Sequence, residues 1–193
     1  MPGKLQGYTC VRRGGIPAPA VLSGARRARV APVLKGICLA ILVLFPAIAA
    51  GAEIVGRPRV IDAGTLDFSG RIVRLYGIDA PDVSQTCRAD GREWPCGLEA
   101  RWAAINRIGS HWVTCATVSE TAEGGLAAVC YLAGLGQMDL NAWLVARGWA
   151  LADPAATTGY KTQEAAARSA HKGLWKGRFV PPRDWREGRR LAP

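Results

Sequence analysis

The stretch Val60–Leu66 reads VIDAGTL, and Arg74–Asp82, which follows it closely, reads RLYGIDAPD. Val60–Leu66 and Ile72–Ile78 are both rich in residues that favour β-strands, and the pair at 69–70 between them is Ser-Gly, which is typical of a turn. We therefore expect a β-hairpin whose second strand leads directly into an acidic turn.

The second strand and the turn after it carry three charged side chains. Arg74 and Asp79 lie five residues apart, and Asp82 follows in a segment that Pro81 stiffens by fixing its own backbone angle. An arginine and two carboxylates on one hairpin could hold a hard cation beside a phosphate group.

Three further segments have the apolar spacing of helices, and one more pair of segments predicts a hairpin. A helix is expected over 98–108, and two later helices are expected to end at Gly148 and Gly173. The predicted hairpin pairs 113–118 with 126–132. The residues expected on the buried stripe of the first helix are Leu98, Trp102, Ile105 and Ile108.

The hairpin motifs resemble those of the staphylococcal nuclease (thermonuclease) family, whose pattern is V-I-D-G-D-T followed by R-L-x-x-[IV]-D-x-P-E. The blocks 138–150 and 160–175 also resemble family helices, M-x-x-N-x-x-L-V-x-x-G-x-A and E-x-x-A-x-x-x-x-x-G-L-W. The resemblance covers Arg59–Trp175. It implies an α+β fold, a five-stranded OB-type β-barrel with two to three packed α-helices.

The resemblance also implies roles for the charged residues of the hairpin. Arg74 would contact the scissile phosphate, Asp82 would act as general base, and Asp79 would bind Ca²⁺. These residues would carry out the family's calcium-dependent hydrolysis of phosphodiester bonds in DNA or RNA.

Three positions depart from the family pattern. Gly64 stands where the family has a calcium-binding aspartate, Gly124 where it has a phosphate-binding arginine, and Asp82 where it has glutamate. Removing one charge-stabilising group typically lowers an enzyme's rate by about 10²–10³. We therefore expect nuclease activity to be weakened or lost. The alternative is a non-catalytic OB-fold module that binds single-stranded DNA, RNA or another envelope protein.

Four cysteines follow residue 53. Cys115 and Cys130 are equidistant from the turn of the second predicted hairpin, so they could face each other across it and form a disulfide. Cys87 and Cys96 would then close a small loop. A metal site is the competing interpretation, although the sequence has no C-x-x-C spacing and only two histidines.

Residues 1–52 have the composition of a secretory leader. They contain seven basic residues and no acidic one, and the apolar run ICLAILVLFPAIAA ends just before Ala52-Glu53. We expect cleavage near Glu53 and a periplasmic or secreted monomer without a stable membrane span. The alternative is an uncleaved leader that anchors the chain in the inner membrane.

The domain is expected to span 53–178, with a Pro- and Arg-rich tail over 179–193. The chain's net charge of +10 belongs mostly to its two ends, because 168–190 alone holds eight basic residues and two acidic ones. Basic residues supply most non-specific affinity for nucleic acid. The tail residues expected to bind it are Arg183, Arg186, Arg189 and Arg190.

Overall fold

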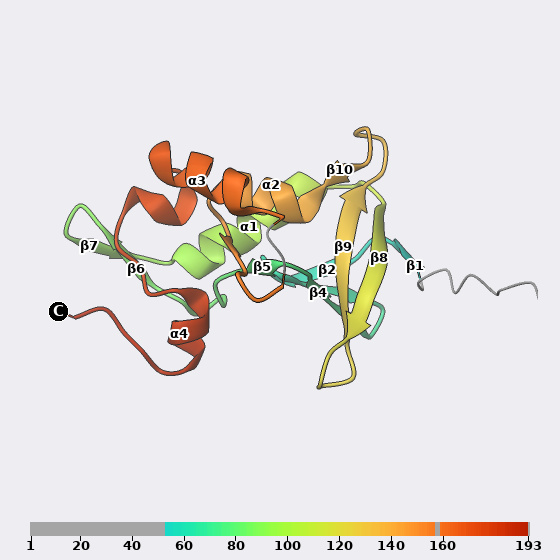
Figure 1. Ribbon diagram of the computed structural model, residues 1–193, viewed down its shortest axis with the longest axis horizontal. Coiled ribbons are helices and arrows are strands. Elements are labelled where there is room, and N and C mark those ends of the chain that lie inside the picture. Colours follow the sequence, from blue (N-terminus) through green and yellow to red (C-terminus); the bar gives the residue numbers. More distant parts are fainter. Residues whose placement is uncertain (1–52, 157–158, 193) are drawn as a thin grey trace, which may run out of the picture. The chain divides into compact units, whose positions relative to one another are not determined.

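A computed structural model of the chain describes residues 53–156 and 159–192, so the predicted leader lies outside the described residues (Figure 1). The strands are β1 (Glu53–Gly56), β2 (Arg59–Asp62), β3 (Thr65–Phe68), β4 (Arg71–Leu75), β5 (Ile78–Asp79), β6 (Cys87–Ala89), β7 (Arg92–Trp94), β8 (Val113–Glu120), β9 (Leu126–Leu132), β10 (Met138–Asp139) and β11 (Leu151–Ala152). The helices are α1 (Cys96–Ile108), α2 (Leu140–Ala146), α3 (Lys161–Ser169), the 3₁₀ helix η1 (Gly173–Lys176) and α4 (Pro182–Arg186).

The main sheet confirms the α+β, OB-type fold class. Its strands run in the order β1-β8-β9-β4-β3-β2, and β10 adds to β9, so it has seven strands where five were expected. All of these pairs are antiparallel except β4 with β9. We call this sheet, with α1 and α2 packed on it and the segment 76–82 that follows β4, the barrel.

The prediction of one strand over Val60–Leu66 was wrong, because the stretch forms two strands, β2 and β3, joined by a tight turn at Ala63 and Gly64. Asp62 accepts a hydrogen bond from the backbone N–H of Gly64 at 2.7 Å. An aspartate that bonds its own backbone two residues on favours a turn over a continuing strand. The expected turn at Ser69-Gly70 is present between β3 and β4, where both residues have positive φ.

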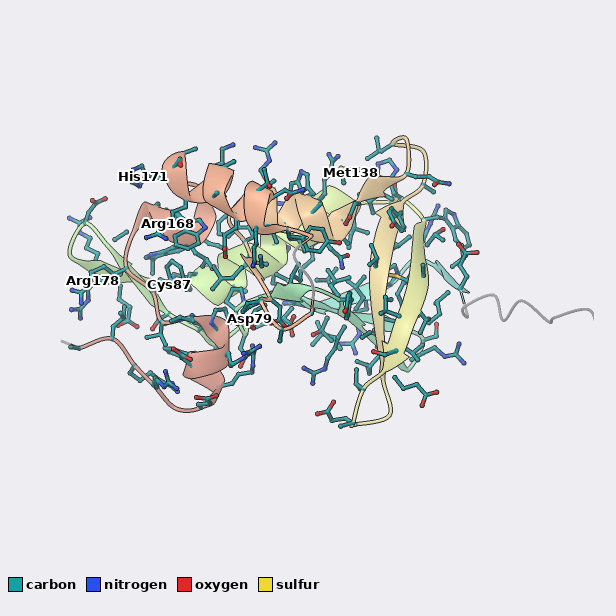
Figure 2. The ribbon with its side chains drawn as sticks, viewed as in Figure 1. Asp79, Cys87, Met138, Arg168, His171 and Arg178 are labelled. Atoms are coloured by element: carbon teal, nitrogen blue, oxygen red, sulfur yellow. A yellow bond between two sulfur atoms is a disulfide. The ribbon has the colours of Figure 1, made fainter. Side chains whose placement is uncertain are left out.

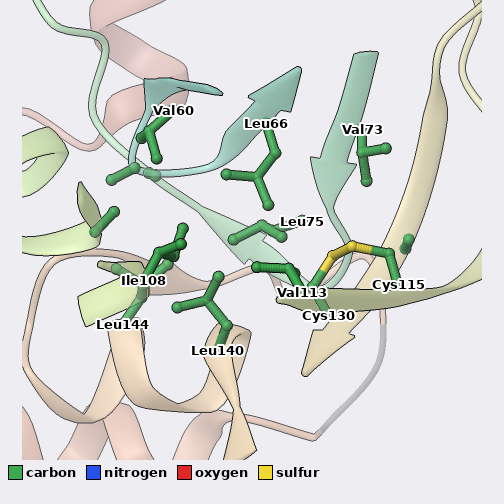
Figure 3. Packing of buried hydrophobic residues seen from close by; sticks show 14 of the residues in the cluster. Val60, Leu66, Val73, Leu75, Ile108, Val113, Cys115, Cys130, Leu140 and Leu144 are labelled. Atoms are coloured by element: carbon green, nitrogen blue, oxygen red, sulfur yellow. A yellow bond between two sulfur atoms is a disulfide. The ribbon is translucent and has the colours of Figure 1, made fainter. Parts of the chain in front are cut away.

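The second predicted hairpin is confirmed as β8–β9. Its register places Cys115 opposite Cys130, and the two form a disulfide inside the core (Figure 3). The disulfide Cys87–Cys96 is also present.

The first predicted helix is confirmed as α1, which starts at Cys96. On its predicted buried stripe, Ile108 is buried and Ile105 packs against the core, but the placement of Trp102 was wrong. Trp102 is 51% exposed, and the side that packs into the core carries Ala100, Ala104 and Ile108. Small alanines allow the helix to lie close to β2, whereas an indole there would hold the two apart. Figure 3 shows Ile108 together with Leu140 and Leu144 of α2 in the same core.

Part of the predicted tail over 179–193 is instead folded. Pro182 and Val180 are buried, and α4 lies against the barrel's acidic turn. A small second core of Cys87, Cys96 and Leu174 lies beneath Trp94 and Phe179. We call the segments β6–β7, η1 and the chain through α4 the cover (residues 87–94 and 173–186).

Within the described ranges, none of the helices is long and apolar enough to cross a membrane.

Candidate functional site

A small hollow of about 90 Å³ brings the three predicted site residues together. It lies where the β2–β3 turn, β4, β5 and α4 meet. Arg74, Asp79 and Asp82 all line it. Two further charged side chains that the sequence did not assign to the site complete its lining, and these are Asp62 and Arg186.

Asp79 is held at the site by the pairing of β5 with β11, in which it lies opposite Leu151. Both of its carboxylate oxygens are bonded to α4. The backbone N–H of Arg183 donates to Oδ2 at 3.0 Å, and Nη2 of Arg186 donates to Oδ1. Figure 2 shows Asp79 beside the α4 ribbon. The metal ligand predicted from the sequence is therefore occupied by a partner from the chain itself.

Asp82 shares the same partner. Nη1 of Arg186 lies 3.4 Å from Asp82 Oδ1 and 3.3 Å from the backbone oxygen of Ala80. Burial by itself lowers the pKa of Arg186, but its hydrogen bond and charge interaction with Asp79, and then with Asp82, outweigh burial and raise it. The guanidinium is thus firmly charged where it bridges the two carboxylates.

Gly64 lines the hollow with its backbone only, so the carboxylate that the β2–β3 turn contributes is that of Asp62. The backbone oxygen of Gly64 accepts from the N–H of Leu75 at 2.8 Å, and a Cβ placed on Gly64 would meet the Cβ of Ala80 at 3.0 Å. The nearby Asp62 is partly buried, and burial raises the pKa of its carboxyl in spite of the bond it accepts from Gly64. A side chain at position 64 would have to push Ala80 aside.

A calcium ion fits poorly into this set of residues. Calcium takes six to eight oxygen ligands, usually including more than one free carboxylate. Here position 64 offers no carboxylate, and both oxygens of Asp79 already accept hydrogen bonds. Among the residues that the structure describes, no group of three or more His, Cys, Asp or Glu side chains is placed to hold a metal ion.

Arg74 connects this hollow to a second, more open one of about 670 Å³ between the β3–β4 and β8–β9 turns. Arg71 lines the second hollow as well, and Glu123 approaches Arg74 to 3.9 Å. Gly124 also lies here, with φ of +77° and nothing within 4 Å of where its Cβ would be. Position 124, where the resemblance leads us to expect an arginine, therefore faces open space beside Arg71, Arg74 and Glu123.

The side chains of the other C-terminal arginines point to other partners. Arg183 pairs with Asp153 at 3.0 Å, and Arg189 pairs with Asp184 and with Glu187. Arg190 lies over the ring of Trp185, 3.7 Å from its centroid. Of the four tail arginines, Arg186 alone reaches the predicted site residues with its side chain, and nothing in the local sequence distinguishes it from its neighbours.

Comparisons with known proteins agree with the resemblance in the sequence. Residues 72–177, more than half of the chain, match the family described as staphylococcal nuclease homologue. The chain is also similar to the succinoglycan biosynthesis protein ExoI of Rhizobium meliloti (strain 1021), with 28% identity over 171 residues that cover 87% of each chain.

Proposed function

This chain belongs to the staphylococcal nuclease homologue family, and we propose that it is an exported member that binds single-stranded nucleic acid but hydrolyses phosphodiester bonds weakly or not at all. The observation that carries the proposal is the state of the site. Position 64 has no carboxylate, and both oxygens of Asp79 are bonded to α4.

The loss of hydrolysis follows from what a phosphoryl transition state needs. Charge develops on the phosphate oxygens and must be met by positioned cations or donors. Gly124 supplies no such donor, and Oδ1 of Asp82 already faces the guanidinium of Arg186 at 3.4 Å. Because the affected groups act together in catalysis, repairing any one of these positions alone would restore little activity.

Binding is supported by the open hollow between the two turns. Arg71 and Arg74 lie in its wall, and arginines are well suited to phosphate because their planar fork makes paired hydrogen bonds. An OB-type sheet also commonly presents a nucleic-acid surface. Arg189 and Arg190, both exposed, would extend the basic surface along the C-terminal segment.

Export is supported by the cysteines. Cys115–Cys130 and Cys87–Cys96 are both disulfides, and such bonds persist mainly in oxidising compartments. The leader composition of residues 1–52 agrees with this proposal.

The test measures binding and cleavage separately on labelled single-stranded DNA and on RNA of the same sequence. With chelator present, the natural chain should bind, and Arg71→Ala/Arg74→Ala should bind about tenfold more weakly, with a salt slope reduced by about one for each arginine. The matched control is Arg92→Ala/Lys172→Ala, which removes the same charge from exposed positions outside both hollows. It should behave like the natural chain.

Cleavage is then measured in millimolar calcium and in chelator. Slow or absent cleavage in both supports the proposal. Rapid calcium-dependent cleavage that is lost in Asp79→Asn would refute it, and so would a natural chain that binds neither nucleic acid.

A further inference from the structure

We propose that Arg186 takes the place of the divalent cation, so that the positive charge between the site's carboxylates belongs to the chain itself. The family is generally calcium-dependent. Here the acidic turn is instead neutralised by a side chain that reaches it from more than 100 residues further along the sequence.

The guanidinium of Arg186 contacts the kind of oxygen atoms that a calcium ion selects. It bonds Oδ1 of Asp79, Oδ1 of Asp82 and the backbone oxygen of Ala80. Calcium also binds carboxylate and backbone carbonyl oxygens. A guanidinium presents several donors in a fixed plane and does not lose its proton, so it can satisfy such a set permanently.

The remaining oxygen of Asp79 is also taken. The backbone N–H of Arg183 donates to Oδ2 at 3.0 Å, so no oxygen of this carboxylate lacks a donor from α4. A calcium ion would have to displace both donors. It would also have to lie beside the positive charge of Arg186, which repels it.

Arg186 is delivered by an anchored segment rather than a loose end. The fully buried Gln85 donates from Nε2 to the backbone oxygen of Val180 at 2.7 Å. Arg88 and Arg178 exchange backbone hydrogen bonds of 2.9 and 2.7 Å, and Pro182 at the start of α4 is buried. These contacts fix the chain immediately before α4, so Arg186 is held at the hollow.

Calcium binding and thermal unfolding test the proposal without using nucleic acid, so its failure can be told apart from failure of the proposed function. For the natural chain, millimolar calcium should give no heat in titration calorimetry and no shift of the melting temperature against chelator. Arg186→Gln should melt lower in chelator and regain a few degrees in calcium, because Oδ1 of Asp79, Oδ1 of Asp82 and the backbone oxygen of Ala80 lose the donor that occupied them.

Arg189→Gln is the matched control. It removes the same charge three residues away, where the partners are Asp184 and Glu187 rather than the site, and it should show no calcium response. Arg186→Gln/Asp79→Asn should lose the response that Arg186→Gln gains.

Calcium binding by the natural chain as tight as that of Arg186→Gln would overturn the proposal. So would a folded Arg186→Gln with no calcium response. If Arg186→Gln does not fold, the calcium titration of the natural chain still tests the proposal. Arg186→Lys, which keeps the charge without the planar guanidinium, should fold and bind calcium no better than the natural chain.

Discussion

The barrel contains the disulfide Cys115–Cys130, and the disulfide Cys87–Cys96 ties the cover to the start of α1, but different interactions hold the two regions together. The barrel's core has 19 buried residues, whereas the core of the cover has three. Apolar burial is the main stabilising contribution in folding, so the barrel can remain folded with several polar contacts removed. The cover depends instead on its disulfide, on Gln85 and on the ion pairs of α4.

This difference bears on the site, because the two parts contribute opposite charges to it. The barrel supplies Asp62, Asp79 and Asp82, and the cover supplies Arg186. Regions with few buried apolar contacts open at a lower free energy than the rest of a fold. The acidic half of the site therefore rests on the more stable part, and the cation that neutralises it rests on the less stable part.

Removing each disulfide separately should give the largest effects and the clearest contrast. Cys115→Ala/Cys130→Ala should lower the free energy of unfolding by about 3–5 kcal/mol, since it removes a bond in the core between residues 15 apart. Cys87→Ala/Cys96→Ala removes the disulfide that closes a shorter loop, and it should lower the free energy of unfolding by about 2–3 kcal/mol. Urea unfolding measures both.

Hydrogen exchange distinguishes where the protection is lost. Cys115→Ala/Cys130→Ala should lose protection throughout β8 and β9, and Cys87→Ala/Cys96→Ala should lose it mainly in the cover, including α4. Equal losses in the same amides would show that the barrel and the cover unfold as one unit and that the cover is not the less stable part.

Gln85→Ala should detach the cover while leaving the barrel intact. The change leaves the backbone oxygen of Val180 without its donor, and an unsatisfied buried group typically costs about 1–3 kcal/mol. Limited trypsin digestion should then release the C-terminal peptide about tenfold faster or more, because cleavage follows the population of the opened segment.

The control for this change is Gln163→Ala, on α3, whose side-chain oxygen is buried without a partner, so little is lost by removing it. Its digestion pattern should match the natural chain. Rapid digestion within β8 or β9 in Gln85→Ala would mean that the barrel, too, relies on this bond.

The parts of the fold that the sequence predicts are those with local signals. The β8–β9 hairpin and its disulfide follow from alternation around one turn, because pairing across a turn fixes which cysteines meet. Helix α1 and its buried Ile108 were located correctly, but Trp102 was not, since this large side chain dominates an apolar pattern while the small Ala100 and Ala104 do the packing.

The residues of the site also divide into those with a local sequence signal and one without it. Arg74, Asp79 and Asp82 lie within nine residues of one another, so the predicted hairpin and the family motif both group them. The partner of the two aspartates lies 104 and 107 residues away, in a segment whose Pro-Pro and repeated arginines are typical of an extended tail. No periodicity connects Arg186 to the acidic turn, because a docked segment is specified by buried contacts such as Gln85, not by local spacing.

The smallest effect is expected from a surface pair that belongs to the barrel alone. Asp67 on β3 accepts hydrogen bonds from Nη2 of Arg59 at 2.8 Å and from the N–H of Gly70 at 2.6 Å. The hydrogen bond from Arg59, followed by that from Gly70, lowers the pKa of Asp67 below its ordinary value of 3.8. A carboxylate with a lowered pKa stabilises the fold above its unfolded pKa, and that stabilisation is lost as the pH falls through the folded pKa.

Asp67→Asn should therefore lower the melting temperature slightly at neutral pH, and the difference from the natural chain should shrink as the pH falls below 3.8. Added salt should reduce the difference as well, because exposed ion pairs are screened. Circular dichroism melts across the pH range measure this, with Arg59→Gln as the reciprocal variant and the double variant to test that the two losses do not add.

Release of the C-terminal peptide by trypsin should stay unchanged in all three, because neither side chain contacts the cover. A melting difference that is constant with pH would show that Asp67 acts through packing rather than charge, and faster release of the peptide would show that the barrel's surface charges hold the cover in place.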